Sequence, residues 1–187
     1  MCGRLSVIRD PLCHIVRDKF GISFQTDTNQ DLRPTQQVAC VMQKSGQLQQ
    51  GNLIWGIQPG WTNSVIFNAK AETVSVKATF IDGFENSRVI VPCSGWYEWV
   101  DEQGQKEKYC FSPGNNDVFY VAGILLENKT KLIILTTESN DQCREYYERM
   151  PLLIETDCVM TWLTGPVERV FPLLINPFSD DIKINRA

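Results

Sequence analysis

Short apolar segments joined by turn-forming residues dominate this sequence and constrain its fold more than any other feature. The paired segments are 38–42 with 48–57, 96–100 with 106–111, and 118–126 with 132–136. Their connections are Ser45-Gly46, Glu102-Gln103-Gly104 and Glu127-Asn128-Lys129. Apolar runs of this length around compact turn signals are typical of β-hairpins. The sequence therefore predicts many short strands.

Helices are predicted between these strands. Asp10-Pro11 resembles an N-cap followed by a first-turn proline, and apolar residues then recur at helical spacing up to Gly21. Strands interspersed with helices indicate an α+β protein, and 187 residues are most simply one domain spanning 1–187. The other expected elements are an exposed loop over 24–36, short strands at 65–67, 88–92 and 152–154, helical pieces within 73–86, and helices at 140–147 and 156–163 capped by Asn140 and Thr156.

Composition excludes several classes of protein. Hydrophobic residues make up 43% and charged residues 21%, which is ordinary for a soluble globular protein. No apolar run is long enough to span a membrane and no secretory signal is visible, so we expect a cytoplasmic protein. The formal net charge of −4 gives no global attraction to nucleic acid, and a nucleic-acid function would need a local basic cleft.

The cysteine and histidine content argues against metal and disulfide chemistry. Seven cysteines are scattered without a Cys-x-x-Cys pair, and His14 is the single histidine. This pattern is typical neither of a disulfide framework nor of a zinc site, and one histidine makes a Ser-His-Asp triad a poor fit. We expect no metal and no cofactor.

Cys2 is the most unusual chemical feature of the chain. If Met1 is removed, Cys2 carries a free α-amine beside its thiol, and this 1,2-aminothiol can condense with an aldehyde to a thiazolidine ring. The two groups titrate near ~8 and ~8.5, so part of each is nucleophilic at neutral pH. Arg4 follows closely with a guanidinium that suits phosphate. Taken alone, a Met-Cys start can equally be an accident of translation.

A carboxylate among aromatic residues is the second unusual feature. In a strand, the segment from Gly95 to Trp99 would place Trp96 and Glu98 on one face and the other aromatic residues on the opposite face. Desolvation there would raise the pKa of Glu98 toward the range useful for acid–base catalysis. The residues alone leave open a surface glutamate between two core tryptophans.

Several other polar and aromatic residues have both a functional and a plain interpretation. Asn68 could fix a small polar group and share a face with Lys70, or it could cap the chain beside a solvated lysine. Arg149 could bind an anion or be solvated. Pro34 and Trp61, in predicted loops, could stack on bases or cover the core.

Taken together, these segments resemble the SOS-response-associated peptidase family, the SRAP domain. Its hallmarks have counterparts here in the family's order, over residues 2 to about 154, and the region after about 165 matches poorly. The matching segments are Cys2-Gly3-Arg4, Trp55-Gly56 with Pro59-Gly60-Trp61, Asn68-Ala69-Lys70-Ala71-Glu72, Gly95-Trp96-Tyr97-Glu98-Trp99 and Tyr147-Glu148-Arg149-Met150-Pro151.

The resemblance implies covalent capture of abasic sites in single-stranded DNA. We expect the protein to be a monomer. The resemblance implies Cys2 as the nucleophile, Asn68 as a positioning residue, and Glu98 as the acid–base group for autocatalytic removal of Met1 and for imine formation. It implies that Arg4, Lys70 and Arg149 contact phosphate and that Thr136 lies near the sugar or phosphate. The implied fold is a mixed, bifurcated β-sheet with a small barrel-like core surrounded by helices.

The sequence departs from the family in two side chains. Tyr147 stands where the family has a histidine that assists sugar opening and crosslink reversal, and Lys70 replaces an arginine. A phenol with a pKa near ~10 is a poor proton shuttle at neutral pH. We therefore expect slower sugar opening and a slower-reversing crosslink.

Two other functions remain open from the sequence. One is a non-catalytic single-stranded-DNA-binding module that keeps the cleft but lacks efficient chemistry, because the histidine is missing and the site is blocked while Met1 is attached. The other is a thiol peptidase acting on proteins, which normally needs a Cys-His pair.

Overall fold

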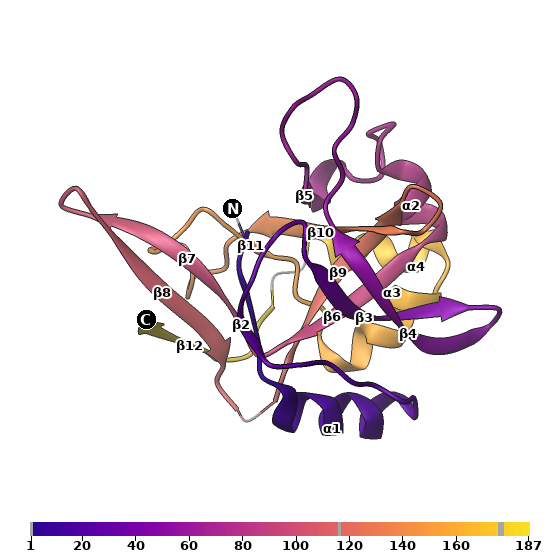
Figure 1. Cartoon of the computed structure of the whole chain (residues 1–187), viewed down its shortest axis with the longest axis horizontal. Coiled ribbons are helices and arrows are strands. Elements are labelled where there is room, and N and C mark those ends of the chain that lie inside the picture. The colour runs from indigo at the N-terminus through magenta and orange to yellow at the C-terminus, as the bar shows by residue number, and fades with distance from the viewer. Residues whose placement is uncertain (1, 116, 176–177) are drawn as a thin grey trace.

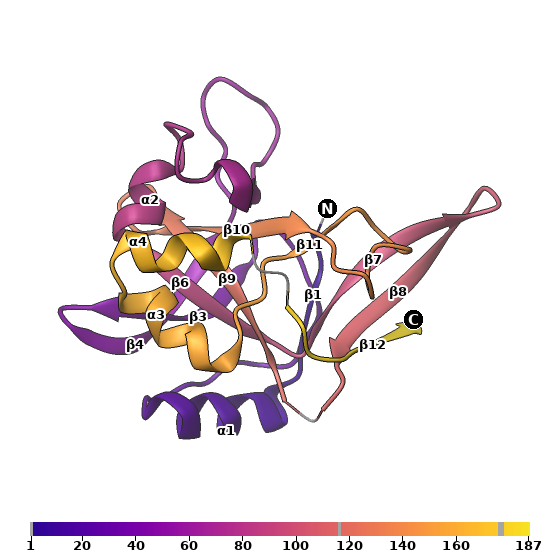
Figure 2. The ribbon, with the colours of Figure 1, turned by 180° about the vertical axis from the view of Figure 1, so that it is seen from behind.

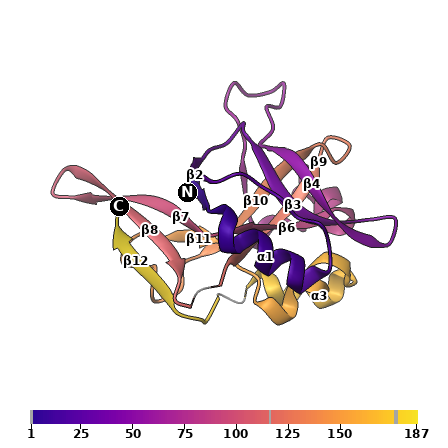
Figure 3. The same cartoon turned by 60° about the horizontal axis from the view of Figure 1, so that its bottom comes forward.

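The first of two sheets is antiparallel and carries the start of the chain. In the computed structural model, which describes residues 2–115, 117–175 and 178–187, its strand order is β12-β8-β7-β1-β2. The strands β7 and β8 form a long hairpin that projects from the body, and β12 covers its outer edge (Figures 1 and 3). The bounds are β1 Leu5–Val7, β2 Asn29–Leu32, β7 Gly95–Glu102, β8 Gln105–Pro113 and β12 Ile182–Arg186.

The second sheet is mixed and closes into a ring. Its strands follow the order β11-β10-β4-β3-β6-β9, and β9 pairs again with β10. The strand β10 runs parallel to β4 and to β5, and the other pairings are antiparallel. The bounds are β3 Gln37–Lys44, β4 Gln47–Trp55, β5 Asn68–Lys70, β6 Arg88–Cys93, β9 Phe119–Leu126, β10 Lys131–Glu138 and β11 Arg149–Pro151. This confirms the predicted α+β class, with a mixed sheet whose strand pairings form a closed ring.

One of the crossings between the two sheets consists of a single residue. The chain leaves β6 and enters β7 through Ser94, whose backbone N–H donates to the carbonyl of Ser6 on β1 at 2.8 Å. Every residue of β6 is buried, and the first four residues of β7 are buried as well. The connection is therefore built into the core, and it carries the aromatic–carboxylate segment from the ring toward β1.

Helices cover the ring on two sides (Figures 1 and 2). The buried Arg88 fastens α2 and α3 to β6, because its guanidinium donates to the carbonyls of Phe84 and Glu85 and to those of Trp162 and Gly165. No helix in the part of the chain that the structure describes is long and apolar enough to cross a membrane. The helices are α1 Arg9–Phe20, α2 Ile81–Asn86, α3 Val159–Thr164 and α4 Val167–Val170, with short 3₁₀ turns η1 Ala71–Thr73, η2 Thr156–Cys158 and η3 Phe171–Leu174.

The three predicted hairpins and the buried strand are confirmed. The residues at all three turns have positive φ, as tight connections between antiparallel strands require. They are Ser45 and Gly46, Gln103 and Gly104, and residues 127–129. Gly21 ends α1 in the left-handed region at φ 63°. Local turn chemistry thus determined these elements.

Several other elements differ from the prediction. The expected loop over 24–36 contains β2, because Leu32 and Phe24 bury apolar side chains. The expected helix at 140–147 is a series of turns held by Asn140, whose carbonyl accepts from two backbone N–H groups. The strands expected at 65–67 and 152–154 form at 68–70 and 149–151 instead, where β10 offers free backbone partners.

Of the three predicted helix caps, those at Asp10 and Thr156 are wrong, whereas Asn140 Oδ1 accepts from the backbone N–H of Cys143 at 3.1 Å although the segment forms turns and not a helix. Asp10 has an extended backbone at the start of α1, but its carboxylate lies 3.6 Å from His14 Nε2, and no side-chain cap bond is formed at this helix start. Thr156 lies inside η2 and Glu155 is the residue before that turn.

Candidate functional site

Cys2 is fully buried and lies three residues before the start of β1. The pairing of β1 with β7 places Leu5 opposite Trp96, and the backbone N–H of Tyr97 donates to the carbonyl of Arg4 at 3.0 Å. Continued in the same direction, this pairing carries Cys2 toward the second half of β7. Its side chain has 0% exposure.

Glu98 lies on the buried face of β7, as alternation predicted. Its side chain is 3% exposed, whereas Trp99 on the opposite face is 37% exposed. Burial raises the pKa of Glu98 to about 7. The interpretation of Glu98 as a surface residue is therefore wrong, and near neutral pH this carboxyl group can both donate and accept a proton.

Cys2 and Tyr147 both lie within electrostatic range of Glu98. Burial, and after it the charge of Glu98, raises the pKa of the Cys2 thiol well above its usual value. Burial and then Glu98 also raise the pKa of the Tyr147 phenol. Three residues from distant segments thus converge, and both the thiol and the phenol are held neutral.

A second group of predicted residues meets on β10. The parallel pairing of β5 with β10 places Asn68 opposite Ile134 and Lys70 opposite Thr136. Asn68 Nδ2 donates to the carbonyl of Ile134 at 3.4 Å, while Asn68 Oδ1 is buried and has no hydrogen-bond partner in the described residues. A buried amide oxygen without a donor is a position ready to accept one from a ligand or a moving group.

Arg149 is held by its own protein. Its Nη1 and Nη2 donate to the two carboxylate oxygens of Glu72 at 2.6 and 2.9 Å, and Nη2 also donates to the carbonyl of Thr136 at 2.6 Å. Thr136 Oγ1 lies 3.2 Å from the same nitrogen. The fork of Arg149 therefore joins η1, β10 and β11, and Glu72 is a site residue that the sequence did not single out.

The two groups meet at the segment that enters β11. Tyr147 belongs to the group around Glu98, and Arg149, two residues later, belongs to the group on β10. The structure thus gathers Cys2, Glu98, Tyr147, Asn68, Thr136 and Arg149 into one region.

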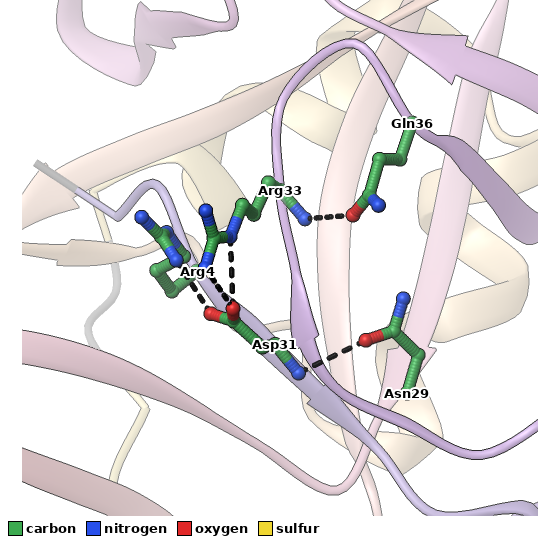
Figure 4. A network of polar contacts seen from close by, with 5 residues as sticks. All are labelled: Arg4, Asn29, Asp31, Arg33 and Gln36. Atoms are coloured by element: carbon green, nitrogen blue, oxygen red, sulfur yellow. Dashed lines mark hydrogen bonds and ion pairs between the residues drawn. The ribbon is translucent and has the colours of Figure 1, made fainter.

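The opposite face of β7 carries a polar network (Figure 4). Arg4 Nη1 donates to Asp31 Oδ1 at 2.5 Å, and Arg33 Nε donates to Asp31 Oδ2 at 2.8 Å. The guanidinium carbon of Arg4 lies 5.5 Å from the ring centre of Trp99. Asp31 and Arg33 were not predicted as functional residues, although their i, i+2 spacing places them on one face of an extended segment.

Pro34 and Trp61 lie at neighbouring connections. Pro34 is half-buried in a turn that is tied to the end of β4, because the N–H of Thr35 donates to the carbonyl of Trp55 at 2.7 Å. The loop that begins after Trp55 carries Trp61, which is 72% exposed. Trp61 therefore does not cover the core, and it is available for stacking.

His14 is remote from Cys2. It lies on α1, at the bottom of Figure 1, with its side chain 67% exposed and its ring beside Asp10. The structure therefore forms no Cys2–His14 pair. Among the residues that the structure describes, no group of three or more metal-ligating side chains could hold an ion.

A family model described as SOS response associated peptidase (SRAP) matches residues 1–186. The chain belongs to the SRAP family. The match extends through the region after Gly165, where α4, η3 and β12 complete the fold. The family assignment from the five sequence segments is thus confirmed.

Curated relatives cover most of the chain at low identity. One is the "Abasic site processing protein YoaM" of Bacillus subtilis, 25% identical over 179 residues, covering 87% of this chain and 79% of the relative. Another is the "Abasic site processing protein YoqW" of Bacillus phage SPbeta, 24% identical, covering 87% and 80%.

Solved structures share the fold. A protein from Bordetella bronchiseptica superposes with a TM-score of 0.81 at 18% identity, covering 100% of this chain and 99% of its own. One from Bacteroides thetaiotaomicron gives 0.75 at 21% identity, covering 97% and 90%. Both likenesses concern the fold alone.

Proposed function

We propose that this SRAP protein forms a covalent crosslink through Cys2 to abasic sites in single-stranded DNA. The observation that carries the proposal is the buried Glu98, with a pKa raised by burial to about 7, beside Cys2. Relatives named abasic site processing proteins support a substrate of this kind.

The chemistry needs a free α-amine on Cys2, so Met1, which lies outside the described residues, must first be hydrolysed off. The amine nitrogen then bonds to the aldehyde carbon of the opened sugar, and loss of water gives an imine. The thiol sulfur bonds to the imine carbon, and its proton passes to the nitrogen to give a thiazolidine. Glu98 takes a proton from the amine and returns one to the departing hydroxyl.

The neighbouring residues have supporting roles in this proposal. Asn68 Oδ1, buried without a donor, accepts from the α-amine of Cys2 and holds it toward the aldehyde. Tyr147 donates a hydrogen bond to the sugar oxygen. Lys70, exposed at the end of β5, contacts phosphate, and Trp61 and Pro34 stack on bases beside the lesion.

The test is a denaturing gel of the protein incubated with single-stranded DNA that carries one abasic site. The wild type is expected to give a shifted band, Cys2→Ala none, and Cys158→Ala, a matched control, a normal band. Intact mass reports loss of Met1. Absence of a band from protein that has lost Met1 would contradict the proposal.

A second candidate is single-stranded-DNA binding without chemistry. The observation favouring it is Tyr147, a phenol whose pKa is raised by burial where the family supplies a histidine. DNA binding without a band on the gel would support it. The peptidase alternative has no comparable support, because His14 is exposed on α1.

A further inference from the structure

The outer face of the five-stranded sheet carries an open groove of about 720 Å³ on the side of β7 away from Glu98. Arg4, Arg33 and Lys108 supply three positive charges to its lining, and Asp31 supplies one negative charge. Tyr97 and Trp99 form an aromatic floor. Arg4 is two residues from Cys2, and Tyr97 and Trp99 flank Glu98 in β7, so the groove neighbours the proposed crosslinking site across this strand.

Asp31 binds two arginines at once. Arg4 donates to Oδ1, and Arg33 donates through Nε and Nη2 to Oδ2 (Figure 4). Hydrogen bonds from Arg33 and then Arg4 lower the pKa of Asp31, so the carboxylate stays charged. Its backbone is fixed as well, because its N–H donates to Asn29 Oδ1 at 3.0 Å. The cluster of Arg4, Asp31 and Arg33, here named the arginine clamp, has a net charge of +1.

The clamp keeps donors for a ligand. Arg33 uses one edge of its guanidinium for Asp31, and Arg4 uses only Nη1. No other hydrogen bond of either guanidinium is formed within the described part of the chain. Their free N–H groups border the groove, and the Arg33 side chain is 54% exposed. Paired arginine edges of this kind suit the oxygens of a phosphodiester.

Lys108 extends the positive charge along the groove. Its Nζ lies 3.9 Å from the ring centre of Tyr97 and 5.8 Å from that of Trp99, and Arg4 lies over the same Trp99 ring. No ion pair of Lys108 with a carboxylate is formed among residues 2–115, 117–175 and 178–187. Half-buried on aromatic rings and without a counter-charge, its ammonium group is placed to meet an anion.

We propose that this groove is a second DNA contact, in which Arg33 and Lys108 bind phosphodiester groups of the strand that continues beyond the Cys2 site. Asp31 is the positioning residue that orients Arg4 and Arg33. This proposal rests on the proposed function, which identifies the bound strand as single-stranded DNA. It adds to that function a path for the strand beyond Cys2 and the residues Asp31, Arg33 and Lys108.

The salt dependence of binding to a lesion-free oligothymidylate tests the groove. Each phosphate contact contributes a slope of about −0.7 in log K against log salt for single strands. Arg33→Gln and Lys108→Gln are each expected to weaken binding several-fold and to reduce the slope by about 0.7, and the double variant by about 1.4. The matched control Lys19→Gln, on exposed α1, is expected to leave the slope unchanged. An unchanged slope in the double variant would overturn the proposal that this groove binds DNA.

The Asp31→Asn variant separates the role of Asp31 in orienting Arg4 and Arg33 from its effect on the net charge of the groove. Removing a negative charge from a DNA groove should tighten binding if only net charge matters, whereas loss of the clamp should weaken it despite the added positive charge. We expect weaker binding, with Asp18→Asn on α1 as the control for net charge. Tighter binding would overturn the positioning role. The abasic-site crosslink, assayed in parallel, keeps failure of this proposal distinct from failure of the proposed function.

Discussion

At the scale of single residues, the pKa of Glu98 shows how strongly burial can change a side chain. The same carboxyl group on an exposed strand would be fully ionised at neutral pH. On the buried face of β7, near Cys2, burial raises the pKa of Glu98 to about 7. The proposed acid–base chemistry depends on this burial, which the aromatic neighbours of Glu98 suggested and the tertiary structure decided.

The raised pKa of Glu98 predicts a pH-dependent stability. In the unfolded chain the carboxyl group ionises near ~4.3, and in the folded protein near 7. Folding therefore favours the protonated form, so the contribution of Glu98 is fully present below about pH 4.3 and is lost as pH rises to about 7. Urea unfolding at several pH values should show this loss for the wild type and not for Glu98→Gln. Parallel curves for the two proteins would contradict the assignment.

Because Tyr147 is a poor proton shuttle at neutral pH, we expect slow crosslinking that the Tyr147→His substitution accelerates. An imidazole has a pKa near ~6.5, so Tyr147→His places a proton shuttle beside Glu98, and we expect crosslinking at pH 7 to become about tenfold faster or more. Single-turnover crosslinking rates measure it. Tyr147→Phe is the matched control, which tests the phenol hydroxyl alone. No gain in rate for Tyr147→His would count against a proton-shuttle role at this position.

At the scale of elements, β10 organises the site by accepting partners from several parts of the chain. Its end pairs with β5 on one side and β11 on the other, and the Arg149 fork ties η1 across both. Although burial acts in the opposite direction, hydrogen bonds from Arg149 lower the pKa of Glu72. The ion pair thus holds Asn68 and Lys70 in register with Thr136.

Glu72→Gln is therefore expected to weaken both stability and crosslinking. Arg149, only 15% exposed, would keep its charge without a carboxylate, which costs about 1–2 kcal/mol of unfolding free energy for a partly buried pair. Crosslinking should slow because β5 is less firmly held. Glu148→Gln, exposed next to Arg149, is the matched control. Wild-type rates in Glu72→Gln would show that the pair does not position the site.

At the scale of the whole molecule, the junction between the two sheets decides how the site is assembled. Gly95 opens β7 directly after Ser94, and a Cβ there would lie 2.4 Å from the carbonyl oxygen of Phe111 on β8. Backbone atoms cannot move aside as a flexible side chain can. The close approach of β7 and β8 at this point therefore needs glycine.

Gly95→Ala is expected to destabilise the protein by about 1–3 kcal/mol, the range for overpacked interiors. Thermal unfolding monitored by circular dichroism measures the shift. Gly60→Ala is the matched control, because nothing lies within 4 Å of a Cβ at Gly60 and its φ is ordinary. Equal melting temperatures for Gly95→Ala and the wild type would mean that the junction is not tightly packed.

The sequence by itself determined the hairpins, the end of α1, the buried strand and the family, because each depends on residues within a few positions of one another. Turn residues with positive φ and alternating apolar runs act locally. Where tertiary contacts compete with local preferences, the predictions from local patterns were wrong. The segment after Asn140 forms turns and not a helix. The strands β5 and β11 form where β10 offers backbone partners.

Only the tertiary structure decided the state of the site. Glu72 and Arg149 are 77 residues apart, and Arg4 and Asp31 are 27 apart, so no local pattern could pair them. Burial of Glu98 likewise depends on β7 pairing with β1, which comes from the start of the chain. Desolvation and ion pairing act between groups that meet only after folding. For that reason the sequence could suggest a desolvated Glu98, but the tertiary structure decided between this and a surface glutamate and determined the ion-pair partners.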